Sequence, residues 1–138
     1  MFVSNLSIKK WVGNKNEGNL IENPDWSQIE AAIRQLNGKN QTLVTLAADD
    51  ETYMTIGGGY AGKYVVSVTF DNLDFYNLVD LSKPEATEKL VIGGQEGFYP
   101  AKMSVDWLRC LLAARTFSES GKLDSLLSWE EDKALVTV

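Results

Sequence analysis

The segment TIGGGYAGKYVVSVTF, residues 55–70, contains the residue types that most directly suggest chemistry. It can be read as G-x-x-x-x-G-K from Gly57 to Lys63, and also as G-x-G-x-x-G through Gly57, Gly59 and Gly62. Both patterns are typical of loops whose backbone N–H groups hold phosphates at the start of a helix. The segment therefore raises the hypothesis of a nucleotide-binding enzyme.

The residues around the glycines argue against that hypothesis. The stretch that follows, KYVVSVTF, alternates β-branched and aromatic residues, so it predicts a strand where a phosphate-binding loop needs a helix. Tyr64 stands where such a loop carries the Ser or Thr that holds Mg²⁺. Asp80 lies near the distance expected of a ribose-binding acid, but the βαβ unit around it is missing. We expect a tight strand-to-strand turn with Tyr60 exposed at its tip.

The composition removes most other catalytic chemistry. The chain has no His and a single Cys, Cys110, which excludes zinc sites and nucleophiles activated by His. We expect Cys110 to be a small buried hydrophobic side chain on a helix. An enzyme would have to rely on carboxylates, Lys, Tyr or a bound oxygen-ligated cation.

Acidic residues occur in two runs, Asp49-Asp50-Glu51 and Glu130-Glu131-Asp132. Neither fits the D-x-[DN]-x-[DN]-G spacing of a calcium loop, so we interpret both as solvated charges at turns and helix ends. Asp71 and Asp74 flank the turn DNLD, where an Asp side chain commonly accepts hydrogen bonds from the backbone. A hydrolase that uses a pair of carboxylates remains an open alternative.

Length and charge describe a small acidic domain. With 138 residues and 44% hydrophobic composition, residues 1–138 are expected to form one domain with its own core. A net charge of −6 disfavours nucleic acid as a partner and suits a basic protein. No apolar stretch is long enough for a membrane span, and the start of the chain lacks the pattern of a signal peptide. We expect a cytoplasmic location, which the lone Cys also fits.

The stretch NPDWSQIEAAIRQLNGK, residues 23–39, predicts the clearest helix. Asn23 is placed to cap it, and Pro24 suits the first helical position. The helix is expected to end at Asn37-Gly38. Its apolar residues recur at helical spacing and predict a buried stripe: Trp26, Ile29, Ile33 and Leu36.

A second helix is predicted over SVDWLRCLLAARTFSESG, residues 104–121. Ser104 is the expected cap, and Gly121 is the expected stop. Five residues recur at helical spacing and predict the stripe that faces the core: Trp107, Leu108, Leu111, Leu112 and Arg115.

The remaining segments predict strands joined by turns. Five segments are predicted to be strands: residues 1–12, QTLVTLA, TYMTI, GKYVVSVTF and FYNLVDL. The segment VGNKNEGN is predicted to be a loop. KLVIGGQEGFYPAKM combines a short strand with a Gly-Gly turn, and the apolar end of the chain is a candidate for a last strand. The predicted fold class is α+β, a mainly antiparallel sheet packed by two helices on one face.

In the order and spacing of these segments, the chain resembles the first family of immunity proteins of bacterial polymorphic toxin systems. The segments that carry the resemblance are NPDWSQIEAAIRQLNG, TLVTLAADDETYMTIGGGYAGKYVV, VIGGQEGFYPAKM and AARTFSESGKLDSLLSWEED. The resemblance implies a binding protein that occludes a cognate toxin, such as a nucleic-acid deaminase. It also implies that the protein is not an enzyme and has no catalytic residue, no metal and no cofactor. The expected oligomeric state is a monomer or weak dimer. A nucleotide-binding or hydrolytic enzyme, and an adaptor unrelated to toxins, remain the alternatives.

Immunity proteins must each fit their own toxin, so residues shared by the family are expected to hold the fold. We assign seven such positions to structure: Trp26, Gly57, Gly58, Gly59, Gly93, Gly94 and Trp129. Exposed acidic and aromatic residues near loops are better candidates for contact with the toxin. We predict six toxin-binding residues: Asp49, Asp50, Glu51, Tyr60, Glu96 and Tyr99.

Overall fold

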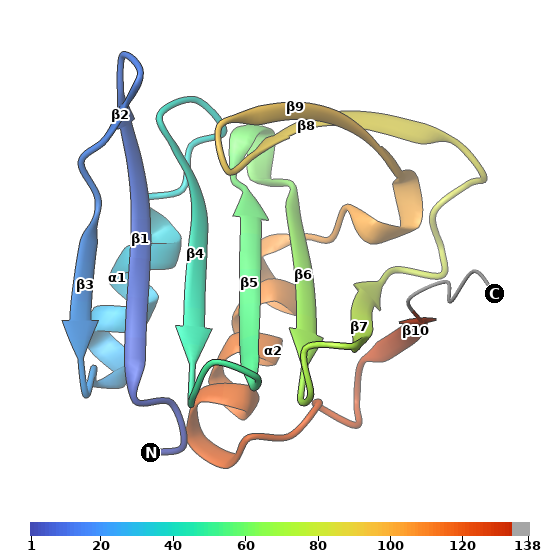
Figure 1. The fold of residues 1–138 in the computed structure, drawn as a ribbon. Helices are drawn as coiled ribbons and strands as arrows, with labels where there is room; N and C mark the ends of the chain where they lie inside the picture. The colour runs from blue at the N-terminus through green and yellow to red at the C-terminus, as the bar shows by residue number, and fades with distance from the viewer. Residues whose placement is uncertain (134–138) are drawn as a thin grey trace, which may run out of the picture.

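The computed structural model describes residues 1–133, which form an antiparallel sheet with two α-helices on one face and a β-hairpin across the other (Figure 1). In this part of the chain the sheet runs in the order β10-β7-β6-β5-β4-β1, and both β2 and β3 pair with β1. Its strands are β1 (Asn5–Val12), β2 (Lys15–Asn16), β3 (Asn19–Glu22), β4 (Gln41–Ala47), β5 (Tyr53–Gly58), β6 (Tyr64–Thr69), β7 (Asp74–Val79) and β10 (Ser128–Lys133). The predicted α+β class, with both helices on one face, is confirmed.

Alternation along the central strands separates the core from the opposite face of the sheet. In β4, Thr42, Val44 and Leu46 are buried, whereas the residues between them are half-buried. The buried set from each strand packs beneath the helices. The sheet contributes these side chains to the core: Leu6, Val44, Leu46, Met54, Ile56, Val66, Val68 and Leu78.

The segment VGNKNEGN was predicted to be a loop, and the structure corrects this in part. The two-residue β2 folds back on the end of β1, and β3 then pairs along the first half of β1. Each is too short for the strand alternation on which the sequence prediction relied, so only the pairing with β1 defines them.

Helix α1 (Trp26–Arg34) starts two residues later than Asn23 was expected to place it. Asp25 is the N-cap: its Oδ1 accepts the backbone N–H of Gln28 at 2.8 Å, and the Gln28 side chain accepts the N–H of Asp25 at 3.0 Å. Asn23 instead has a positive φ of 50°, so the chain turns there before Pro24. Two reciprocal hydrogen bonds favour Asp25 because they satisfy two otherwise free backbone donors.

Helix α2 (Trp107–Ser120) is likewise capped by a different residue from the one predicted. Asp106 accepts the backbone N–H of Arg109 at 2.9 Å, whereas Ser104 is buried at the end of a short 3₁₀ turn, η2 (Ala101–Met103). The predicted stop at Gly121 is confirmed, with a φ of 71°.

The face that α2 turns to the core differs from the predicted leucine stripe. Leu108 and Leu112 are exposed, and the helix instead buries Cys110, Ala113, Ala114, Phe117 and Ser118. Small side chains let the helix approach the sheet closely, and the large Phe117 fills the core beneath it. The burial of Cys110 agrees with the prediction.

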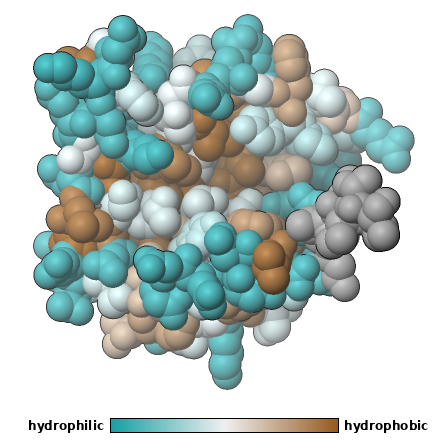
Figure 2. Space-filling model, in the orientation of Figure 1, coloured by the Kyte–Doolittle hydropathy of each residue, from teal (hydrophilic) through white to brown (hydrophobic). Residues whose placement is uncertain are grey.

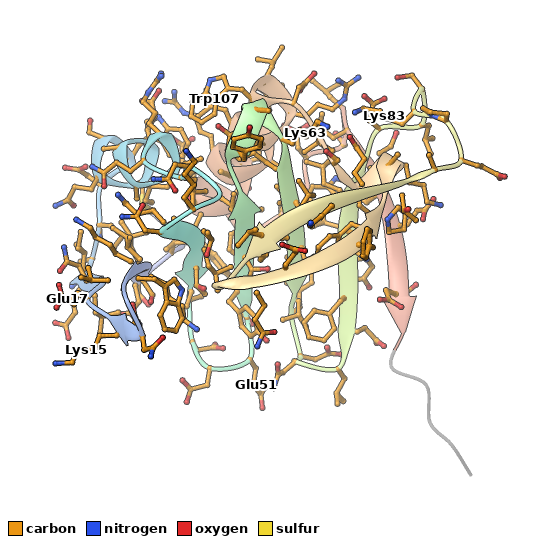
Figure 3. The ribbon with its side chains drawn as sticks, turned by 90° about the horizontal axis from the view of Figure 1, so that it is seen from above. Lys15, Glu17, Glu51, Lys63, Lys83 and Trp107 are labelled. Carbon is orange, nitrogen blue, oxygen red and sulfur yellow. The ribbon has the colours of Figure 1, made fainter. Side chains whose placement is uncertain are left out.

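A hairpin of β8 (Thr87–Ile92) and β9 (Gln95–Pro100) crosses the sheet on the side opposite the helices, as Figures 1 and 3 both show. Its turn is formed by Gly93 and Gly94, both with positive φ, as the Gly-Gly pair predicted. At the tip, the N–H of Gly94 donates to the hydroxyl of Thr42 at 2.8 Å. The hairpin is thereby attached to β4 of the sheet.

The acidic run Glu130-Glu131-Asp132 does not lie in a turn or at a helix end, as predicted, but within β10. This strand pairs with β7 at the edge of the sheet, with Glu130 opposite Asn77. The pairing is long-range, so the polar composition of the run gave no indication of it. The candidate strand at the apolar C-terminal end lies outside the described residues.

Candidate protein-binding face

The glycine loop connects β5 to β6 through the 3₁₀ turn η1 (Tyr60–Gly62), which confirms the predicted strand-to-strand turn. Lys63, the cation of the apparent phosphate-binding motif, lies 2.6 Å from Glu88 of the hairpin. Gly59 has a φ of 105°, and a Cβ at this position would overlap the carbonyl of Leu36. Gly59 therefore allows the loop to pack closely against the residues that follow α1.

The sheet surface opposite the helices carries the most extensive candidate site; we call it the open face. Strand register places its side chains in three parallel rows. The row nearest the top of Figure 1 consists of Lys9, Leu43, Gly57 and Val65, which are neighbours on β1, β4, β5 and β6. The hairpin packs over this row, because a Cβ on Gly57 would overlap the side chain of Ile92.

The middle row is polar and spans the sheet. Paired positions on β1, β4, β5, β6, β7 and β10 place one polar residue from each strand side by side: Ser7, Thr45, Thr55, Ser67, Asn77 and Glu130. All six are half-buried. We call this set the polar row.

Hydrogen bonds within the polar row are confined to one end. Ser67 donates to Asn77 at 2.6 Å, and Glu130 pairs with Lys102. The hydroxyls of Ser7, Thr45 and Thr55 have no hydrogen-bond partner among the described residues. Each hydroxyl can both donate and accept, so these three are available to a bound molecule.

The lowest row includes two aromatic residues. Ala47, Tyr53, Thr69, Phe75 and Asp132 are paired neighbours on β4, β5, β6, β7 and β10. Tyr53 and Phe75 are half-buried, so part of each ring remains accessible to a partner. In Figure 2, which looks onto the open face, brown and white atoms lie across the middle between teal groups above and below.

Two acidic turns border the lowest row. They are held together, because Tyr53 donates to Asn72 at 2.7 Å and Thr52 donates to the carbonyl of Phe70 at 3.0 Å. We call residues 48–52 and 70–73, together with Asp74, the acidic rim. In Figure 3, Glu51 of this rim lies at the turn at one end of the strands, and Trp107 lies at the opposite end.

Two carboxylates of the acidic rim, those of Asp49 and Asp71, accept hydrogen bonds from the backbone. Asp71 accepts the N–H groups of Leu73 and Asp74, both at 2.9 Å, which confirms the predicted Asx turn. These hydrogen bonds lower the pKa of Asp71 below its ordinary value, so the carboxylate is charged at neutral pH. Asp49 makes the same kind of turn with the N–H groups of Glu51 and Thr52.

Ion pairs lie away from the acidic rim. Among the described residues, the paired carboxylates are Glu30, Asp80, Glu88, Glu96, Asp106, Glu119 and Glu130. None of Asp49, Asp50, Glu51, Asp71 and Asp74 forms an ion pair with a described side chain. The negative charge of the rim is therefore uncompensated locally.

The hairpin forms the upper border of the open face. Its attachment is electrostatic as well as apolar, because Glu88 lies 2.6 Å from Lys63 and 3.8 Å from Lys83. These cations lower the pKa of Glu88, the hydrogen bond from Lys63 being the largest contribution. On the outer side of the hairpin, Phe98 is 74% exposed.

The six predicted toxin-binding residues fall into two groups. Asp49, Asp50 and Glu51 lie together on the acidic rim, and all three are exposed. Three others lie at the opposite end of the sheet: Tyr60 on η1, and Glu96 and Tyr99 on β9. Tyr60 is 62% exposed, and Glu96 is paired with Lys89 at 2.8 Å.

The polar row, Tyr53, Phe75 and Phe98 are not among the residues predicted from the sequence to bind the toxin. A signal was present, because Thr45, Thr55 and Ser67 each alternate with buried apolar residues in a predicted strand. The alternation shows that these residues lie opposite the core. Their alignment across six strands depended on the register.

A second, apolar surface lies on the edge beside α2. Four leucines with exposed fractions of 40–89% surround a groove of about 420 Å³: Leu81, Leu108, Leu112 and Leu126. We call it the leucine groove. Arg109 lies at its side, 3.6 Å from Asp80 and 2.7 Å from Asp106. The charges at this groove are thus paired within the protein.

Residues for catalysis or metal binding are not gathered in the described part of the chain, where no group of three His, Cys, Asp or Glu side chains could hold a metal ion. Burial strongly raises the pKa of the Cys110 thiol, so it stays protonated and unreactive. None of the described helices is long and apolar enough to cross a membrane.

The comparisons with known proteins identify the family. No curated protein and no solved structure shows significant similarity to the chain. The model of the family Immunity protein Imm1 matches residues 17–131, which include every element from β3 to α2 and most of β10. An immunity protein neutralises a toxin by binding to it. Since this match covers most of the sequence, the chain belongs to the Imm1 family of immunity proteins.

Proposed function

We propose that this protein neutralises a toxin that acts on nucleic acid, such as a deaminase, by binding stoichiometrically and occluding its active site in the cytoplasm. Membership of the Imm1 family carries the proposal. The net charge of −6 and the uncompensated acidic rim support a basic partner, because a toxin that holds nucleic acid must present cationic side chains to phosphates.

The proposal does not require chemistry by this chain. The glycine loop packs against neighbouring elements, and its lysine, Lys63, is already paired with Glu88. The one cysteine, Cys110, is buried and protonated. The paired lysine disfavours the nucleotide-binding alternative, and the buried cysteine is not accessible as a nucleophile.

The test begins with the gene next to the one that encodes this chain. Co-expression of this chain with a toxin domain encoded there should abolish the lethality of the toxin. Cells should not be protected when this toxin is expressed with an unrelated immunity protein, or when this chain is expressed with an unrelated toxin. Failure of the chain both to bind that neighbour and to protect against it would refute the proposal.

A titration in vitro separates occlusion from catalysis. Toxin activity should fall linearly with added immunity protein and reach zero at a 1:1 ratio, because each inhibitor blocks one active site. Nucleic-acid substrate should compete with the immunity protein for the toxin. Complete inactivation by a small fraction of an equivalent would instead show that this chain is an enzyme.

A further inference from the structure

We propose that the open face is the surface that receives the toxin, and that it takes a basic protein surface whose Lys and Arg side chains reach the acidic rim. The proposal rests on the proposed function and specifies where the partner binds. One face of the sheet is closed by α1 and α2, and the hairpin covers only the upper row of the other. In the remaining two rows Thr69 is buried and the other side chains are half-buried or exposed, so these rows form a broad accessible surface.

The polar row supplies hydrogen-bonding groups at the centre of this surface. Ser7, Thr45 and Thr55 are half-buried on rigid paired strands, and their hydroxyls have no partner among the described residues. A partner that excludes water from this surface must supply hydrogen-bonding groups in positions that match these hydroxyls. The row therefore favours one register of binding over others.

Aromatic side chains lie on either side of the polar row. Tyr53 and Phe75 project from the lowest row, and Phe98 is exposed on the hairpin above. Partly exposed rings held by a sheet lose little conformational entropy when they are covered, which is why aromatic residues often dominate binding energy. These three are the expected apolar anchors.

The acidic rim determines the charge of the partner. It carries Asp49, Asp50, Glu51, Asp71 and Asp74 without an ion pair to any described side chain. Charges that are unpaired in the free protein attract a cationic surface and accelerate its association. The leucine groove offers no such attraction, because Arg109 beside it is already paired with Asp80 and Asp106.

The experiment uses the full-length protein and, as the probe, the toxin domain encoded by the neighbouring gene with its active site inactivated. Thr55→Arg places a bulky cation in the polar row and should weaken binding by about 100-fold or more, as loss of a central contact does. Leu108→Arg makes the same kind of change in the leucine groove and should alter binding by less than about 3-fold. Thermal unfolding of each variant confirms that it is folded.

Charge is tested separately by association kinetics. The double variant Asp50→Lys/Glu51→Lys should slow association by about 10-fold at low salt, and the difference should shrink at high salt because the ions screen it. Its control is Glu17→Lys/Glu85→Lys, which changes the net charge equally at two exposed positions outside the rim. Equal slowing by both double variants would show an effect of net charge alone and overturn the role of the rim.

Hydroxyl-radical footprinting of the wild-type protein provides a measurement that needs no variant. Tyr53, Phe75 and Phe98 should become protected when the toxin binds, whereas Leu108 and Leu126 should remain labelled. If the toxin binds but protects the leucine groove instead, the proposed function stands and the open face is the wrong surface. If the open face becomes protected as the protein concentration rises in the absence of toxin, it is a self-association surface, and this result also overturns the proposal. If the wild-type protein neither binds nor protects, the proposed function itself fails.

Discussion

Gly57 on β5 lies directly beneath Ile92 of the hairpin, so close that a Cβ at position 57 would overlap the isoleucine side chain. The apparent first residue of a nucleotide-binding motif is therefore the place where the hairpin rests on the sheet. Gly57 has an ordinary strand conformation without a positive φ, so the requirement for glycine here is steric.

Replacing Gly57 by alanine should lower the free energy of unfolding by about 1–3 kcal/mol, because the added methyl group overpacks the contact with Ile92. Chemical denaturation measures the change. Ile92→Ala removes the two closest obstructing atoms, Cγ2 and Cγ1, so the Gly57→Ala change should cost clearly less in that background. If the two changes are simply additive, Ile92 is not the source of the destabilisation.

Two substitutions on α2 test which face of the helix packs on the sheet. Phe117→Ala should lower the free energy of unfolding by about 3–5 kcal/mol, because Phe117 is completely buried in the core. Leu108→Ala, on the same helix but 62% exposed, should change it by less than about 0.5 kcal/mol. Comparable losses from both would mean that the leucine stripe does face the core.

Removing the carboxylate of Asp25 should destabilise the protein by about 0.5–2 kcal/mol, because it accepts the N–H of Gln28 at the start of α1. Asp25→Ala is compared with Asn23→Gly, since glycine tolerates the positive φ at position 23. Thermal unfolding should show a clear decrease for the first variant and little for the second. The reverse order would restore Asn23 as the cap.

Glu88 makes the stability depend on pH in the acidic range. Its pKa in the folded protein is lowered by Lys63, so its contribution is present above the ordinary glutamate value of 4.5 and is lost as the pH falls through the lowered value. Glu88→Gln should therefore reduce stability at neutral pH and flatten its decline in acid.

The control for this prediction is Glu85→Gln, which removes one exposed carboxylate from the loop before β8. Urea midpoints at about pH 7 and about pH 3 are sufficient for the comparison. An acid decline that is as steep in Glu88→Gln as in wild type would show that the ion pair with Lys63 contributes little.

Several features were predictable from sequence because their causes are local. Alternation of apolar residues defined β4, β5 and β6, and glycine at Gly121 ended α2, since each depends on neighbours within a few residues. The choice of caps was predicted less well. Asn23 and Ser104 were plausible by type, but Asp25 and Asp106 lie where their side chains reach the free N–H groups.

Sequence by itself determined the fold class, the family and the excess of negative charge. The periodicity of apolar residues indicates the fold class, the order of the segments indicates the family, and the composition gives the charge. Tertiary structure alone decided which face of α2 is buried and where the hairpin contacts the sheet. It also decided that the six residues of the polar row, with Ser7 at one end and Glu130 at the other, lie side by side. These features depend on contacts between residues far apart in the chain, and a shift of one residue in strand register would turn each polar side chain to the opposite face. The open face exists only when the six strands pair in this order.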